Sequence, residues 1–255
     1  SMPDFTLMQW TLVVIAAFCA GVSKAGLAGV GLLGVTFMAA AVPGRSSSGI
    51  VLPLLIFADV MAASPFREHV QWSQIRRLAW PICAGIFVGW GLLMAIPDAA
   101  FRPIVGSLVL GMLILQVARQ RFPGFDAALP HSKIFAWVTG LLTGTATMVA
   151  NAAGPIASTY LIILSLPKHH FVHTMAWLFL LVNVFKVPFS VHLGLINVGS
   201  LTLNLCLVPA VVVGLWFGKW LLERVPQKAF QAIVLWLATA SALWLITSGL
   251  TWTAK

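Results

Sequence analysis

Two apolar segments of this chain are too long to be single membrane-spanning helices, and their excess length constrains the fold more than any other feature. They cover residues 7–42 and 134–166, about 35 and about 33 residues, whereas one helical span needs about 20. Small and polar residues interrupt both segments, from Gly21 to Gly31 and from Thr143 to Pro155. Glycine weakens a helix, and proline breaks or starts one. We therefore predict a broken or re-entrant helix in each segment.

The composition restricts the fold class. Of the 255 residues, 60% are hydrophobic and only 8% are charged. A soluble domain carries about 25% charged residues, so a soluble globular fold is excluded. The apolar runs are continuous rather than alternating, which disfavours a membrane β-barrel. We predict an all-α polytopic membrane protein. Its remaining apolar segments are 49–64, 78–97, 103–118, 174–194, 201–222 and 230–250.

The two halves of the chain resemble each other. Both contain one long apolar segment followed by three shorter ones. The matching positions, at offsets of about 124 and about 129 residues, are Pro43 with Pro167, Asp59 with Asn183, Gly85 with Gly214, and Gly89 with Gly218. We expect two transmembrane repeats, 1–125 and 126–255, as in many secondary transporters.

Loop charge discriminates between two topologies. If all eight apolar segments cross the membrane once, the loops on the two sides carry seven and six Lys or Arg residues. If segments 7–42 and 134–166 fold back, the numbers become ten and three. The positive-inside rule favours the second arrangement, with the basic side in the cytoplasm and both termini in the periplasm. Each half then has five helical pieces, so the repeats are inverted. The net charge of +9 is accordingly attributed to cytoplasmic loops and not to nucleic-acid binding.

Three charged residues lie deep in apolar segments, namely Lys24, Asp59 and Lys186. Charged side chains are costly in lipid and mark binding sites or ion pathways. Asp59 is the candidate for a coupling proton, because an acid repels an anion unless it is protonated or paired. Asn183 and Lys186 lie one turn apart on a helix face and are candidate substrate contacts. The alternative for Lys186 is that its side chain reaches a nearby membrane surface.

Lys24 lies in the first interruption, close to Gly26, Gly29 and Gly31. We predict that its ammonium group and the backbone N–H groups of these glycines bind an anionic substrate at a half-helix N-terminus. Two structural alternatives remain open. Lys24 could pair with Asp59, and the glycines could serve only close helix packing.

The second interruption offers uncharged donors. It contains Thr143, Thr145, Thr147 and Asn151, followed by Gly154. Hydroxyl and amide groups suit an oxyanion because they donate hydrogen bonds without carrying charge. We take Thr143, Thr145, Asn151 and Gly154 as candidate substrate contacts. The alternative for each threonine is a hydrogen bond to its own helix backbone. No metal site and no cofactor are expected.

Three stretches carry a resemblance to a known family. They are Gly21-x-x-Lys24-x-Gly26-x-x-Gly29-x-Gly31, then Leu52-Pro53-Leu54 through Asp59 to Arg67-x-His69-Val70-x-Trp72, and Asn183-x-Phe185-Lys186-x-Pro188 followed by Gly194. With them the chain resembles, over nearly its whole length, the sulfite exporter TauE/SafE family of bacterial membrane transporters. It departs from the family pattern at Asn151-Ala-Ala-Gly154-Pro155, where family members are richer in glycine. The resemblance implies a multi-pass protein of the bacterial inner membrane that exports anions such as sulfite, sulfoacetate or other organosulfonates.

The leading functional prediction is a secondary active transporter that works by alternating access with proton coupling. An anion channel is an alternative, because it could use the same cationic residues. A membrane-embedded enzyme is less favoured, because Asp59 is the only deep acid and no nucleophile–base pair is evident. The expected partners are a small anion and the lipid bilayer, not nucleic acid. A homodimer is one option for the oligomeric state, which the sequence leaves open.

Overall fold

The computed structural model describes residues 5–25, 27–42, 44–63, 70–122, 132–164, 166, 168–224, 235–236 and 239–247. This described part is helical throughout apart from short connections, which confirms the predicted all-α class. Its labelled helices are α1 (Leu7–Lys24), α2 (Ala28–Ala41), α3 (Ser46–Ala63), α4 (Trp72–Ala95), α5 (Asp98–Arg121), α6 (Lys133–Ala150), α7 (Gly154–Ile163), α8 (Lys168–His192) and α9 (Val198–Arg224). A further helical stretch covers 239–247.

Both overlong apolar segments are broken, as predicted. The first is divided into α1 and α2, and the second into α6 and α7. The interruptions are shorter than the sequence suggests, because Gly21 still belongs to α1 and Thr143 through Thr147 still belong to α6. A helix satisfies its own backbone hydrogen bonds in lipid, so small and polar residues alone do not end it. The pieces are also unequal, with 18 residues in α1 and α6 but 14 in α2 and 10 in α7.

Seven helices in the described part of the chain are long and apolar enough to cross a membrane. They are α1, α3, α4, α5, α6, α8 and α9. Large apolar side chains on several of them are exposed, including Trp80, Leu205 and Trp216. Such exposure is unusual for a soluble protein and is ordinary for a surface that faces lipid.

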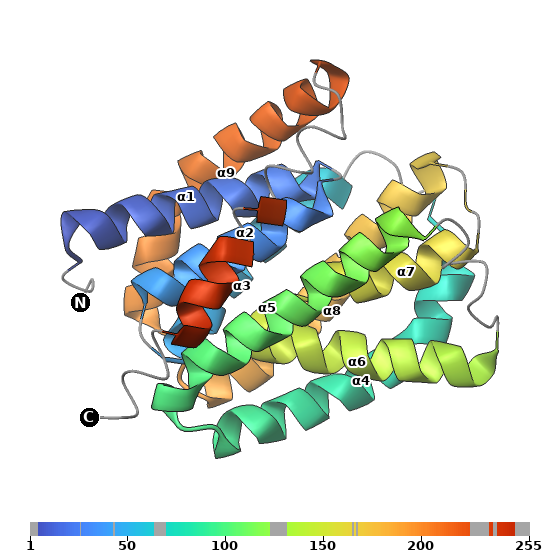
Figure 1. Ribbon diagram of the computed structural model, residues 1–255, viewed down its shortest axis with the longest axis horizontal. Helices are drawn as coiled ribbons and strands as arrows, with labels where there is room; N and C mark the ends of the chain where they lie inside the picture. The colour runs from blue at the N-terminus through green and yellow to red at the C-terminus, as the bar shows by residue number, and fades with distance from the viewer. Residues whose placement is uncertain are drawn as a thin grey trace.

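The two halves of the chain pack crosswise. Among the described helices, the most extensive contacts join α1 to α9 and α4 to α6, while α3 packs against α8 between these two pairs (Figure 1). Glycine allows the close approach in both outer pairs. A Cβ atom on Gly85 of α4 would collide with the carbonyl of Leu141 in α6, and one on Gly214 of α9 would collide with the carbonyl of Phe18 in α1. The first helix of each half therefore packs on the fourth helix of the other half.

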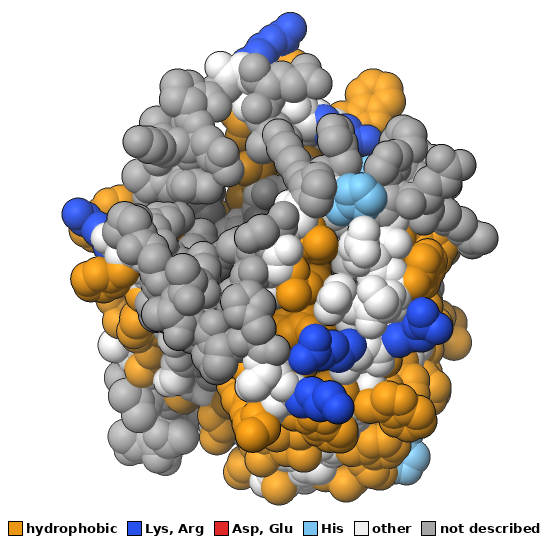
Figure 2. Space-filling view, turned by 90° about the vertical axis from the view of Figure 1, so that its right-hand side faces the viewer, with side chains coloured by type: hydrophobic (Ala, Val, Ile, Leu, Met, Phe, Trp, Pro, Cys, Tyr) orange, Lys and Arg blue, Asp and Glu red, His pale blue; other side chains and the backbone are white. Residues whose placement is uncertain are grey.

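Basic side chains gather at one end of the molecule. Arg76 and Arg77 lie at the start of α4, Arg121 at the end of α5, Lys133 at the start of α6 and Arg224 at the end of α9. These helix ends lie on the right-hand side of Figure 1. Figure 2 views that side and shows Lys and Arg side chains among apolar ones on its described surface.

Candidate functional site

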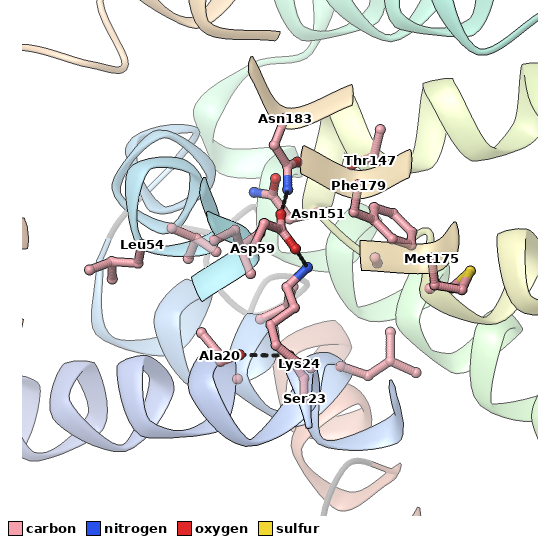
Figure 3. Close-up of a pocket in the computed structure, with 18 of the residues that line it drawn as sticks. Ala20, Ser23, Lys24, Leu54, Asp59, Thr147, Asn151, Met175, Phe179 and Asn183 are labelled. Atoms are coloured by element: carbon pink, nitrogen blue, oxygen red, sulfur yellow. Dashed lines mark hydrogen bonds and ion pairs between the residues drawn. The ribbon is translucent and has the colours of Figure 1, made fainter. Parts of the chain in front are cut away.

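A cavity of about 140 Å³ lies where the two helix breaks meet α3 and α8. Its polar lining includes Lys24 and Asn151 from the two breaks, Asp59 from α3 and Asn183 from α8 (Figure 3). Most other lining side chains are apolar or small. The cavity therefore combines a few charged and amide groups with an apolar wall, as small-molecule sites commonly do.

The first polar group of the site is an ion pair with an amide attached. The Lys24 Nζ lies 2.6 Å from the Asp59 Oδ1. On the other side of the carboxylate, the Asn183 Nδ2 donates a hydrogen bond of 2.7 Å to the Asp59 Oδ2 (Figure 3). Asp59 is fully buried, whereas the side chain of Lys24 is 14% exposed. The Lys24 Nζ also lies 5.0 Å from the centre of the Phe179 ring, a favourable cation–π distance.

The second polar group holds the break between α6 and α7. The buried Lys186 Nζ donates to the Thr147 backbone oxygen at 2.9 Å, to the Thr147 Oγ1 at 2.9 Å and to the Asn151 Oδ1 at 2.6 Å. An ammonium group has three donors, so these three bonds use them all. The positive charge also lies at the C-terminal end of α6, where a helix favours a cation.

Asn151 connects this second group to α3. Its Nδ2 donates to the Ser48 backbone oxygen at 3.0 Å and to the Ser48 Oγ at 3.1 Å. The residue ends α6 in the left-handed conformation with φ of 54°, which asparagine tolerates better than most residues. Lys186 and Ser48 together therefore fix the orientation of the Asn151 amide beside the cavity.

Most of the predicted site residues meet at this cavity. Its lining includes Lys24, Gly31, Asp59, Asn151, Gly154 and Asn183. Lys186 adjoins it through Asn151 and is not part of its lining. Lys24 pairs with Asp59, as one of the two alternatives expected, and it also lines the cavity, while anion binding by Lys24 stays a prediction.

The remaining predicted contacts lie elsewhere. The Thr145 hydroxyl donates to the backbone oxygens of Gly85 and Leu141, so this threonine joins α6 to α4. Thr143 is buried, and neither it nor Gly29 belongs to the cavity lining. Gly26 lies outside the described residues.

Two hydrogen-bond partners of Lys186 and Asn151, namely Thr147 and Ser48, were not among the predicted contacts. Thr147 lies four positions before Asn151, one helical turn away, and this spacing was the signal that could have separated it from Thr143 and Thr145. Ser48 offers no such signal, because 103 positions separate it from Asn151. Only the packing of α3 against the second break brings it there.

The comparison with known families decides the classification of the chain. A family model described as Sulfite exporter TauE/SafE matches residues 13–245. The chain belongs to the TauE/SafE family. This match covers both breaks and every residue of the site, from Lys24 to Lys186. Neither a curated protein nor a solved structure matches the chain significantly. The TauE/SafE family consists of membrane exporters of sulfite and related anions.

Proposed function

We propose that this TauE/SafE protein exports a small sulfur-containing anion, such as sulfite, sulfoacetate or another organosulfonate, by proton-coupled alternating access. The observation that carries the proposal is the position of Lys24. Its ammonium group faces the cavity beside a helix break and contacts one carboxylate oxygen. Because an ammonium group has three donors and Asp59 is its one ion-pair partner among the described residues, Lys24 has donors left for an oxyanion.

The charge of the site favours an anionic substrate. Lys24 and Lys186 contribute two positive charges and Asp59 contributes one negative charge when all three are ionised. The site then carries one net positive charge in surroundings of low dielectric, where charge interactions are stronger than in water. An anion lowers this positive charge when it binds, whereas a cation would raise it.

The apolar wall of the cavity favours an organic body on that anion. Phe171, Met175 and Phe179 occupy successive turns of α8 and line the cavity. A dry apolar cavity of about 150 Å³ binds benzene in an engineered protein, and this cavity measures about 140 Å³. An organosulfonate could place its sulfonate at Lys24 and its carbon body against α8. A bare sulfite ion would leave that wall uncovered.

Alternating access is proposed to arise from two inverted repeats, residues 1–125 and 126–255. The crosswise packing of α1 on α9 and of α4 on α6 supports this, because two symmetric halves would make the contact between a first and a fourth helix twice. Breaks near the midplane are typical of such transporters. We propose that the basic end faces the cytoplasm, that both termini are periplasmic, and that the protein lies in the bacterial inner membrane.

The test is anion flux in proteoliposomes that contain the purified protein. Sulfite, sulfoacetate and benzenesulfonate are offered separately, and uptake should saturate and be accelerated by the same anion on the opposite side. Lys24→Ala should reduce the flux to the level of empty vesicles. The control Lys219→Ala removes an exposed lysine of α9 and should leave the flux unchanged. Flux that does not saturate and shows no acceleration would instead identify a channel, and no flux of any anion would refute the proposal.

A further inference from the structure

We propose that the anion and a proton bind to the cavity together, with Asp59 as the proton acceptor, so that the protein carries both in the same direction. This inference rests on the proposed function and adds the direction in which the proton moves relative to the anion. Its basis is that one ammonium group, that of Lys24, must serve both the Asp59 carboxylate and the substrate.

Lys24 is the ammonium group that is available to the anion. All three donors of Lys186 are engaged by Thr147 and Asn151. Lys24 lines the cavity, and in the described part of the chain its ammonium group has the carboxylate of Asp59 as ion-pair partner and the ring of Phe179 as cation–π partner. An anion that enters the cavity therefore approaches the same ammonium group that Asp59 holds at 2.6 Å.

Two negative groups beside one ammonium group repel each other, and the repulsion is strong where water is excluded. Protonation of Asp59 removes this repulsion and releases Lys24 toward the anion. The proton thus strengthens anion binding, and by linkage the anion strengthens proton binding to the same extent. Among the described residues, the charged groups that face Asp59 are Lys24 from α1 and Lys186 from α8, and of these two Lys24 lines the cavity that the anion enters.

Asn183 is suited to both states of Asp59. With the carboxylate ionised, its Nδ2 donates to the Asp59 Oδ2 at 2.7 Å, while its own Oδ1 is buried and has no hydrogen-bond partner among the described residues. Rotation of the amide by half a turn would exchange these two atoms. The Oδ1 would then accept a hydrogen bond from the protonated carboxyl group, since a carboxylic acid donates where a carboxylate only accepts.

The charge balance follows directly. With Lys24, Lys186 and Asp59 all ionised, the empty site carries two positive charges and one negative charge, a net charge of +1. The loaded site gains one proton and one monoanion, so its net charge is again +1. Empty and loaded forms therefore move the same charge across the membrane, and the complete cycle is electroneutral. Export proceeds when the product of anion and proton concentrations is higher inside the cell than outside.

The experiment is isothermal titration of the purified full-length protein with benzenesulfonate, in buffers of different ionisation enthalpy. This probe is chosen because its own charge does not change with pH, unlike that of sulfite. We expect the uptake of close to one proton per anion bound. We also expect an apparent Kd that weakens by up to about tenfold per unit rise in pH where Asp59 titrates. Proton release, or a Kd independent of pH between about pH 5 and about pH 9, would overturn the inference.

Two aspartate variants identify the group that takes up the proton. Asp59→Asn should bind benzenesulfonate with a pH-independent Kd and without proton uptake. The matched control Asp98→Asn alters an aspartate that pairs with Arg45 outside the cavity, and it should retain proton uptake. Loss of proton uptake in both variants would contradict the role of Asp59. If Asp59→Asn does not fold, the proton count of the wild-type protein still decides the direction in which the proton moves.

Flux experiments distinguish the failure of proton cotransport from the failure of anion transport. In proteoliposomes a pH gradient should drive benzenesulfonate uptake, and a potassium diffusion potential imposed without a pH gradient should not. Flux that follows the membrane potential alone would refute proton cotransport while preserving anion transport. Absence of binding and flux for every anion would refute the proposed function.

Discussion

The side-chain amide of Asn183 donates a hydrogen bond of 2.7 Å to Asp59, a residue 124 positions earlier in the chain. Asp59 and Asn183 are one of the matched pairs of the two halves, at the smaller of the two offsets. Equivalent positions of two repeats can touch each other only close to the axis that relates the repeats. The contact therefore supports the proposed duplication and suggests that the axis passes between α3 and α8, beside the cavity.

The ion pair at the cavity leads to a prediction that separates stability from transport. Lys24→Ala should lower the free energy of unfolding by about 3–5 kcal/mol, because it leaves the buried Asp59 carboxylate without its cation. The double variant Lys24→Ala/Asp59→Asn should recover most of this stability, since no buried charge is then unpaired. It should still fail to transport. Thermal unfolding measures the change in stability, and flux in proteoliposomes measures transport. Transport by the double variant would show that Lys24 is not needed for anion binding.

The left-handed backbone at Asn151 leads to a second prediction. Asn151→Ala loses the bonds to Ser48 and Lys186 and should also cost about 1–2 kcal/mol of backbone strain. Asn151→Gly loses the same bonds but adopts a positive φ freely. The alanine variant should therefore have the lower Tm of the two. Equal Tm values would show that the left-handed turn contributes nothing to the stability of the break.

Close packing of α4 on α6 leads to a third prediction, with an internal control in one helix. Gly85→Ala should destabilise the protein, because its methyl group would collide with the backbone of α6. Gly91→Ala in the same helix meets open space and should be neutral or stabilising by up to about 1 kcal/mol, since alanine is the better helix former. Comparison of the two Tm values in detergent tests this, and an equal loss at both positions would argue against the packing of α4 on α6.

The arrangement of basic residues leads to a fourth prediction. In a background without cysteine, Arg45→Cys should react with a membrane-impermeant maleimide added to intact cells. Arg76→Cys should react only after the cytoplasmic side is opened, because the basic end is expected to face inward. The two sites lie at opposite ends of the described helices. The reverse labelling pattern would invert the proposed topology.

Much of the fold could be predicted from the sequence because lipid imposes strict local requirements. A membrane helix needs a continuous apolar run of about 20 residues, and segments longer than this must break or fold back. The division of 7–42 and 134–166 into α1 with α2 and α6 with α7 follows from that requirement. The charged candidates Lys24, Asp59 and Lys186 were also identifiable, because each stands alone in an apolar surrounding.

The contacts within the site could not be predicted in the same way. Which threonine reaches the cavity depends on the rotation of α6, and Thr147 reaches it while Thr145 joins α4. The engagement of all three Lys186 donors depends on the position of α8 beside the end of α6. These relationships join residues on different helices, so no local pattern encodes them.

Local sequence patterns were sufficient to predict that the protein lies in a lipid bilayer, which apolar segments it has and which two of them are broken. Each of these properties depends on the hydrophobicity and helix preference of residues that are neighbours in the sequence. Only the three-dimensional packing shows that Lys24 pairs with Asp59, that the hydrogen-bond donors of Lys186 are all engaged, and that α8 forms an apolar wall of the cavity. Those properties depend on distances of a few ångströms between helices, and packing alone sets such distances.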